Sequence, residues 1–169
     1  NISITPRKIN TDPVLYTHVY HYPEQGKKIA YLFYTEFISN YNQSLFNAFA
    51  KFNREGVTDL IVDLRYNPGG DISAATYLGS LIAPRTEVEN KSVFTILSYN
   101  PWINAFFDKE GISRSDSLGV YREKVELNPL DANLNLNNVH ILATNFTYSA
   151  SELTTFCLRP YMKVVHVGE

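Results

Sequence analysis

The stretch that decides how this chain folds lies near its C-terminus and reads Asn145-Phe146-Thr147-Tyr148-Ser149-Ala150-Ser151-Glu152-Leu153. A short apolar run from Val139 to Thr144 precedes it and is typical of a buried strand, whereas the residues after Ser151 are typical of a helix. A serine at such a junction projects its hydroxyl beyond the sheet. The free N–H groups of the helix's first turn and the helix dipole favour negative charge there, as an acyl-transfer oxyanion needs. The sequence therefore predicts that Ser149 is a nucleophile.

The same residues also have a purely structural interpretation. Ser149 is followed three residues later by Glu152, which is the spacing of a capping box. In that arrangement each side chain satisfies an unpaired backbone N–H group at the start of the helix. Taken alone, the stretch favours this cap. We expect the cap to coexist with any catalytic role of Ser149.

A second motif changes that weighting and reads Asp59-Leu60-Ile61-Val62-Asp63-Leu64-Arg65-Tyr66-Asn67-Pro68-Gly69-Gly70. It joins a buried strand and a charged rim to a Pro-Gly-Gly turn that runs into a helix. Gly69 and Gly70 can adopt backbone angles forbidden to other residues and let a ligand approach the main chain closely. A plain strand-to-helix turn is the simpler interpretation of the glycines alone. A phosphate-binding loop is disfavoured because the Gly-Lys-Ser/Thr step is absent.

Together the two motifs resemble those of the S41 family of serine peptidases, the tail-specific or C-terminal processing proteases. In that family one strand ends in Asp-Leu-Arg-x-Asn-Pro-Gly-Gly, and a later strand ends in Ser-Ala-Ser-Glu before a helix. Here these are Asp63 to Gly70 and Ser149 to Glu152, in the family's order. The closing residues from Val164 to Glu169 look like the family's next strand. The resemblance covers most of the chain from about Lys28 onward, and it makes catalysis the favoured interpretation of Ser149.

The resemblance implies an α/β fold of the ClpP/crotonase type, built from repeated strand-strand-helix units with a largely parallel sheet. In that fold the glycine turn lies close to the serine turn. The implied mechanism is attack of Ser149 Oγ on a peptide carbonyl, with the oxyanion bound by the N–H of Ala150 and by that of Gly69 or Gly70. No cofactor and no metal are implied.

The general base implied by the resemblance is a lysine whose pKa is lowered by an apolar setting. In the family it comes from a Gly-Lys step a few residues after the Gly-Glu that ends this sequence. The sequence stops at Glu169, so we expect the 169-residue piece alone to be almost or wholly inactive. Lys163 is the nearest lysine, but it departs from the family's position. His140 and His166 lie in expected strands, where most histidines are structural.

Length and composition favour one α/β domain with a sizeable core, because the chain has 169 residues and 44% hydrophobic content. We expect residues 1–169 to be an S41-type core domain truncated at both ends. The segment from Asn1 to Thr5 reads as the middle of a strand, and we expect neither a signal peptide nor a PDZ domain within the few residues that this sequence gives before the core. Residues 85–138 have a weak, mostly polar pattern and are predicted to form an insertion or lid.

Hydrophobic periodicity predicts the remaining elements. The segments Val14 to Tyr22 and Lys28 to Phe37 have the composition of a β-hairpin. Helices are expected from about Asn42 to Arg54 and from about Ile72 to Ile82. This order predicts right-handed crossovers and a largely parallel sheet. The second hairpin strand is apolar almost throughout, which is typical of a strand covered on both faces.

Composition and residue spacing also argue against several classes of binding partner. A formal net charge of −2 without a basic stripe argues against a nucleic-acid partner, and no apolar run approaches the roughly 20 residues of a bilayer-spanning helix. Cys157, the only cysteine, is predicted to be a structural thiol inside a helix. His18 and His21 would point to opposite faces of a strand, which argues against a metal site.

The resemblance implies protein or peptide substrates and an extracytoplasmic location, either periplasmic or associated with the cell envelope. The sequence does not indicate the oligomeric state. A non-catalytic module that holds a peptide or a hydrophobic ligand would keep the same fold and turns, and the retention of Ser149 with paired glycines counts only mildly against it. Acyl-CoA chemistry on the related crotonase fold has no support, since those enzymes need no serine at a strand-to-helix turn.

Overall fold

The computed structural model describes residues 11–121 and 127–168, so the expected strand at Asn1 to Thr5 lies outside the described residues. Five strands form one sheet in the order β1-β2-β3-β6-β7, and two form a separate sheet, β4-β5. The strands are Val14–Tyr22 (β1), Lys27–Tyr34 (β2), Asp59–Asp63 (β3), Val93–Ile96 (β4), Ser115–Ser117 (β5), Asn138–Ala143 (β6) and Lys163–Gly168 (β7). The α-helices are Asn42–Glu55 (α1), Ile72–Ile82 (α2), Arg85–Glu89 (α3), Pro101–Lys109 (α4) and Ala150–Cys157 (α5). Short 3₁₀ turns occupy Pro23–Gln25, Ser39–Tyr41 and Pro129–Asp131.

The main sheet is mostly parallel, as the sequence predicts. β1 and β2 form the expected antiparallel hairpin, and the pairs β2–β3, β3–β6 and β6–β7 are all parallel. Parallel neighbours need a crossover, which α1 supplies between β2 and β3. The mixed α/β class and the predicted helices are therefore confirmed. The ClpP/crotonase topology that the resemblance implies stays a prediction.

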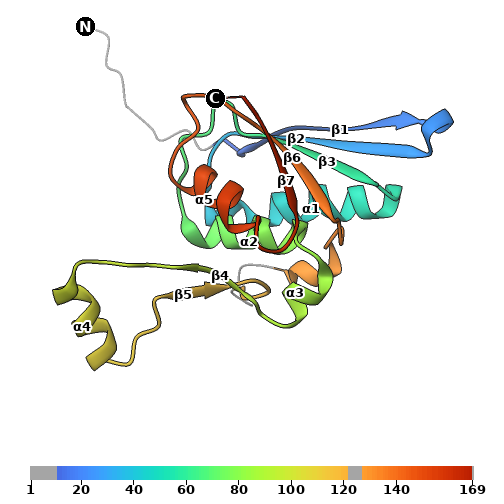
Figure 1. Cartoon of the computed structure of the whole chain (residues 1–169). Coiled ribbons are helices and arrows are strands. Elements are labelled where there is room, and N and C mark those ends of the chain that lie inside the picture. Colours follow the sequence, from blue (N-terminus) through green and yellow to red (C-terminus); the bar gives the residue numbers. More distant parts are fainter. Residues whose placement is uncertain (1–10, 122–126, 169) are drawn as a thin grey trace, which may run out of the picture.

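The helices α1, α2 and α5 lie on one face of the main sheet (Figure 1). Along β2, the side chains of Ala30, Leu32 and Tyr34 point to this face and are fully buried. The alternate residues Tyr31 and Phe33 point to the opposite face and are only partly buried. The prediction that β2 is covered on both faces is wrong for the described part of the chain. Aromatic neighbours explain the apolar run, because Tyr31 contacts Tyr16 with ring centroids 6.2 Å apart, and Phe33 contacts another tyrosine.

Helix α2 is the most deeply buried helix among the described residues. It packs against both α1 and α5, and every residue from Ala74 to Ile82 is buried. The contact between α2 and β4 depends on a glycine, since a Cβ added to Gly79 would lie only 2.7 Å from a ring carbon of Phe94. On α1, the side chains of Leu45, Phe49 and Phe52 lie at helical spacing on one face and are fully buried.

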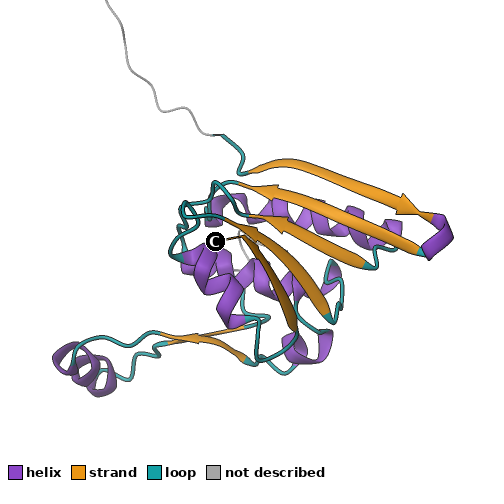
Figure 2. Ribbon diagram, turned by 45° about the horizontal axis from the view of Figure 1, so that its top comes forward, coloured by secondary structure: helices purple, strands orange, loops and turns teal. Residues whose placement is uncertain are grey.

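Residues 93–117 form an arm that extends away from the main sheet (Figure 2). Its base is fixed because Phe94 is buried and the hydroxyl of Tyr161 donates a hydrogen bond to the carbonyl of Val93. At its tip α4 has no buried residue, and Trp102 is 89% exposed. Arg114 holds α4 to the return strand by donating to the side chains of residues 104 and 108. The lid function predicted for residues 85–138 stays a prediction.

Candidate active site

The two sequence motifs meet at one edge of the sheet. Strands β3 and β6 are parallel neighbours, so the loops that follow them leave the same edge. The N–H of Leu64 donates to the carbonyl of Leu142 at 2.9 Å, which continues the pairing beyond β3. The first loop then runs through the glycines, and the second runs from Thr144 to Ser149. Two segments about eighty positions apart in the sequence thus form one surface.

Hydrogen bonds fasten the second loop and α5 onto the first loop. Four donors reach three backbone carbonyl groups: Thr144 Oγ1 to Arg65 O at 2.6 Å, Thr147 Oγ1 to Leu64 O at 2.8 Å, Ser151 Oγ to Asn67 O at 3.0 Å, and the Tyr148 N–H to Asn67 O at 3.3 Å. Ser151 is fully buried and Thr147 nearly so. Because buried carbonyl groups need donors, these bonds fix the position of the serine turn.

Asn67 organises the glycine turn from inside. Its side chain is fully buried, donates from Nδ2 to the carbonyl of Tyr34 at 3.0 Å, and accepts from the N–H of Gly69 at 2.9 Å. No separate role is predicted for Asn67 from its sequence context. An asparagine two residues before a glycine could have indicated this role, because asparagine side chains bond to the backbone two residues ahead in tight turns.

The glycine turn lies in direct contact with the serine turn. Gly69 and Gly70 have φ angles of +102° and +135°, which side chains disfavour. A Cβ added to Gly69 would lie 2.7 Å from the Cβ of Ser149, and one added to Gly70 would lie 2.1 Å from the carbonyl oxygen of Phe37. Phe37 forms a parallel bridge with Gly70, in which it bonds to the neighbours on either side. The structure thus brings together all four residues named from the sequence, Ser149, Ala150, Gly69 and Gly70.

The N–H groups at this junction differ in their bonding. The Gly69 N–H is already bonded to the side chain of Asn67. The N–H groups of Gly70 and Ala150 have no hydrogen-bond acceptor within residues 11–121 and 127–168. In the bridge to Phe37, the backbone groups of Gly70 face away from that residue. Two backbone N–H groups without an acceptor among the described residues therefore lie at the junction with the turn that contains Ser149.

Ser149 has an unusual backbone conformation for a residue at a helix start. Its φ and ψ angles are 55° and −117°, whereas an ordinary N-cap residue lies in the β region. Residues other than glycine rarely have positive φ, and such strain concentrates at functional sites. The N–H of Ser149 donates a hydrogen bond to Glu152 Oε2 at 2.8 Å, which is one of the two bonds of the predicted capping box. The cap is present, but capping does not explain the strained angles.

A comparison with protein families places the chain in a known family. The family model of Peptidase family S41 matches residues 28–169. The chain belongs to the S41 peptidases. The family resemblance of the two motifs is therefore confirmed. A comparison with curated protein sequences finds no match.

Solved structures include two similar S41-type proteins. One, from Bacteroides fragilis NCTC 9343 and assigned to the S41 proteases, is 32% identical, with a TM-score of 0.76 over 95% of this chain and 39% of that chain. The other is the photosystem II D1 C-terminal processing protease, which is 18% identical, with a TM-score of 0.56 over 84% of this chain and 30% of that chain. The second likeness concerns the fold alone. The S41 chain described here spans well under half the length of either protein.

A charged network fixes the start of the glycine loop in this S41 chain. The side chain of Asp63 is 1% exposed and accepts hydrogen bonds from Arg65 Nη2 at 2.7 Å, from Arg65 Nε at 3.0 Å, and from the hydroxyl of Tyr31. Burial alone would raise the pKa of Asp63, but these hydrogen bonds outweigh it and lower that pKa. Asp63 is therefore a charged structural residue with its oxygens fully engaged.

The candidate bases are not bonded to Ser149. Lys163 pairs with Asn138 at the start of β6, whereas Ser149 follows the other end of that strand. His140 lies inside β6, opposite Val165. In the part of the chain that the structure describes, no hydrogen bond joins the hydroxyl of Ser149 to a basic side chain.

A cavity of about 170 Å³ lies on the β7 side of the serine turn and is lined in part by Glu152, His166 and Phe156. It lies on the opposite side of the serine turn from the glycine turn, since β3 and β7 flank β6. Cys157 is half-buried in α5, and burial raises the pKa of its thiol while a hydrogen bond with Thr95 opposes the rise. A raised pKa keeps this thiol protonated, as expected for a structural cysteine.

Across 11–121 and 127–168, no three His, Cys, Asp or Glu side chains gather closely enough to hold a metal ion. Within those same ranges, no helix combines the length and the apolar character needed to cross a membrane.

Proposed function

We propose that this S41 chain is the core of a serine endopeptidase of the tail-specific type, which cleaves unfolded or C-terminal segments of proteins. Ser149 is the nucleophile. The observation that carries the proposal is the strained backbone of Ser149, which a helix cap does not require. A serine on such a strand-to-helix turn holds its Oγ exposed above the sheet, as a nucleophile needs.

In this mechanism Ser149 Oγ attacks the carbonyl carbon of a peptide bond, and a base takes the hydroxyl proton. The base proposed from the family pattern is a lysine that follows Glu169 in the parent protein. The proton then passes to the leaving amine, which breaks the C–N bond and leaves an ester on Ser149. Water attacks the ester as the base takes a proton from it, the base then gives that proton to Oγ, and the bond between Oγ and the acyl carbon breaks to release the carboxyl product.

The oxyanion is bound by the N–H of Ala150 and that of Gly70. These are the two donors that have no acceptor among the described residues, whereas the Gly69 N–H is engaged by Asn67. Gly69 instead contributes the close approach between the loops, because it has no Cβ to contact Ser149. One such donor contributes about 3 kcal/mol of transition-state stabilisation in other hydrolases.

An extracytoplasmic location belongs to the same proposal and rests on the family resemblance. Fractionation of cells that express the tagged parent protein tests it. Recovery of the tagged protein outside the cytoplasm is expected, and recovery only in the cytoplasm would overturn the location without affecting the chemistry.

The nucleophile is tested by reaction with a fluorophosphonate, in which an activated serine oxygen displaces fluoride from phosphorus. We expect peptide mapping of the labelled parent protein to find the adduct on Ser149. Ser151 is the internal control, because it lies two positions away but is buried and bonded to the carbonyl of Asn67. An unlabelled Ser149 in the folded protein would count against the peptidase function.

A further inference from the structure

Three large aromatic side chains on the two loops of the candidate site are exposed to water. Tyr66 is 65% exposed in the first loop, and Phe146 and Tyr148 are 61% and 52% exposed in the second. We call these three residues the aromatic rim. They contribute little to the core, in contrast with the fully buried Phe49. A cluster of exposed aromatic residues beside a candidate site is typical of a binding surface.

The backbone beneath the aromatic rim is fixed. Thr144 Oγ1 accepts a hydrogen bond from the N–H of Phe146 at 3.2 Å and donates to the carbonyl of Arg65 at 2.6 Å. The N–H of Tyr148 donates to the carbonyl of Asn67 at 3.3 Å. These bonds place the three rim residues within one hydrogen-bonded unit. Aromatic side chains on a rigid backbone lose little conformational entropy when they bind a ligand.

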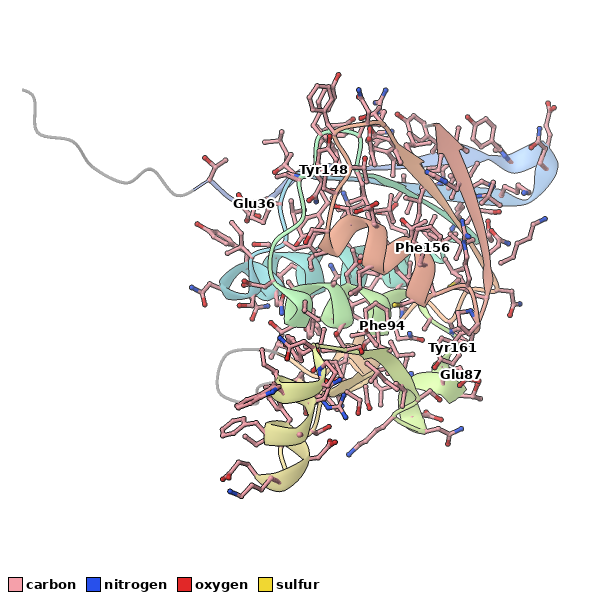
Figure 3. The ribbon with its side chains drawn as sticks, turned by 60° about the vertical axis from the view of Figure 1, so that its left-hand side comes forward. Glu36, Glu87, Phe94, Tyr148, Phe156 and Tyr161 are labelled. Atoms are coloured by element: carbon pink, nitrogen blue, oxygen red, sulfur yellow. The ribbon has the colours of Figure 1, made fainter. Side chains whose placement is uncertain are left out.

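The aromatic rim lies at the end of the molecule that carries the glycine and serine turns. Figure 3 shows Tyr148 near Glu36, at the end of the molecule away from Glu87 and Tyr161. Glu36 precedes Phe37, which bridges the glycine turn. Tyr66 lies on the neighbouring loop, where its ring stands edge-on to Phe33 at 6.4 Å between centroids. The aromatic rim thus belongs to the same edge of the sheet as the serine turn.

The charged groups of these loops have partners already. Arg65 is paired with Asp63, and the carboxylate of Glu152 accepts from the N–H of Ser149. The exposed Glu36 and Glu152 are acidic side chains on this surface, and the aromatic rim supplies its apolar area. That area suits apolar side chains, because burying apolar area is favourable without a matching charge.

We propose that the aromatic rim binds apolar side chains of an extended peptide on either side of its scissile bond. This inference rests on the peptidase function proposed above. The peptide must cross the serine turn, because its carbonyl has to reach both the hydroxyl of Ser149 and the N–H of Ala150. An extended chain advances about 3.3 to 3.6 Å per residue, so the side chains next to that carbonyl lie over residues adjoining Ser149. Tyr148 adjoins Ser149 directly, Phe146 lies three positions before it in the same loop, and Tyr66 lies in the loop to which that loop is bonded.

Peptide binding tests the proposal directly. The probe is a fluorescently labelled, unstructured peptide with phenylalanine at its centre, and a second peptide has serine there instead. Both are titrated into the parent protein carrying Ser149→Ala, which prevents cleavage, and anisotropy is recorded. We expect the phenylalanine peptide to bind at least about tenfold more tightly than the serine peptide, and Tyr148→Ala or Phe146→Ala to remove about tenfold of that affinity.

Tyr22→Ala is the matched control. Tyr22 is 44% exposed, similar to Tyr148, but it ends β1 at the opposite edge of the sheet because β1 runs antiparallel to β2. We expect this variant to bind both peptides as the parent does. The proposal is overturned if neither peptide binds, if the two peptides bind equally, or if the rim variants bind the phenylalanine peptide as tightly as Tyr22→Ala does.

The fluorophosphonate reaction keeps this test separate from the proposed function. Labelling needs a reactive Ser149 but no peptide contact. Labelled Ser149 with unchanged binding in the rim variants overturns the aromatic rim alone. Unlabelled Ser149 with weakened binding in the rim variants overturns the peptidase function and leaves the rim as a peptide-binding surface.

Discussion

Replacing Gly69 with alanine tests whether the glycine and serine turns act as one unit. The new Cβ would lie 2.7 Å from the Cβ of Ser149, 2.8 Å from the carbonyl oxygen of Tyr148 and 2.9 Å from the nitrogen of Ala150. All three distances are shorter than a van der Waals contact, so the serine turn must move. The displaced atoms include the proposed nucleophile's own carbon and an oxyanion donor.

Two effects lower the free energy of unfolding of the Gly69→Ala variant. A side chain at φ +102° costs about 1 to 3 kcal/mol of backbone strain, and overlap with well-packed neighbours costs about 1 to 3 kcal/mol more. We expect Gly69→Ala to lower the free energy of unfolding by about 4 kcal/mol, the middle of the summed range of about 2 to 6 kcal/mol. Peptide cleavage should be lost even at temperatures where the variant is folded, because the nucleophile and the Ala150 N–H no longer keep their relative positions.

Gly26→Ala separates the two parts. Gly26 also has positive φ, +63°, but an added Cβ would meet no atom within 4 Å. It lies in the β1–β2 turn, at the opposite edge of the sheet from Ser149. We expect a loss of about 1 kcal/mol from the backbone alone and unchanged cleavage. Urea unfolding of both variants measures the difference. Equal losses in the two variants, with cleavage retained in Gly69→Ala, would refute the close contact between the turns.

Three further predictions concern Ser149, Asp63 and Cys157. Glycine tolerates the positive φ of Ser149, so Ser149→Gly should raise the free energy of unfolding by about 1 kcal/mol while abolishing cleavage; a destabilised variant would favour the cap as the residue's only role. Asp63→Asn should destabilise the protein by about 2 kcal/mol at pH 7, as judged by urea unfolding, because the hydrogen bonds from Arg65 and Tyr31 lose a buried charged acceptor. Since the pKa of Asp63 is lowered in the folded state, this contribution is present above the unfolded carboxyl pKa near 3.9 and disappears as pH falls through the lower folded value; a difference between parent and variant that persists unchanged well into acid would contradict the pairing. The raised pKa of Cys157 predicts slow alkylation by iodoacetamide at pH 7, with a rate that rises only above the ordinary thiol pKa of about 8.5; rapid alkylation of the folded protein at pH 7 would argue against the protonated thiol.

Local patterns were enough to predict the elements of the main sheet and its helices. The stripe of Leu45, Phe49 and Phe52 has helical spacing, and its burial follows from the need to cover one face of the sheet. The apolar run of β2 was misleading, because Tyr31 and Phe33 contact other aromatic rings on the open face instead of a second layer. Periodicity reports that a side chain is apolar, but not which neighbour shields it.

Some features of the candidate site could likewise be predicted from local sequence, and others could not. Ser149 and the paired glycines could be named because their residue types and order form two specific motifs. The hydrogen bonds of Thr147 and Ser151 to the first loop join residues more than eighty positions apart, and no local pattern encodes such contacts. The same is true of the choice between Gly69 and Gly70 as the proposed oxyanion donor, because it depends on where the side chain of Asn67 bonds. Only the tertiary arrangement supplies that information.

Cleavage of an unstructured peptide with an apolar C-terminus by the parent protein, beside its Ser149→Ala variant, tests the central claim most directly. We predict that the parent protein produces defined fragments and that the variant, folded and still able to bind the peptide, produces none. If parent and variant bind the peptide alike and neither cleaves it, the catalytic role of Ser149 is contradicted, and the chain is a peptide-binding module with a peptidase fold.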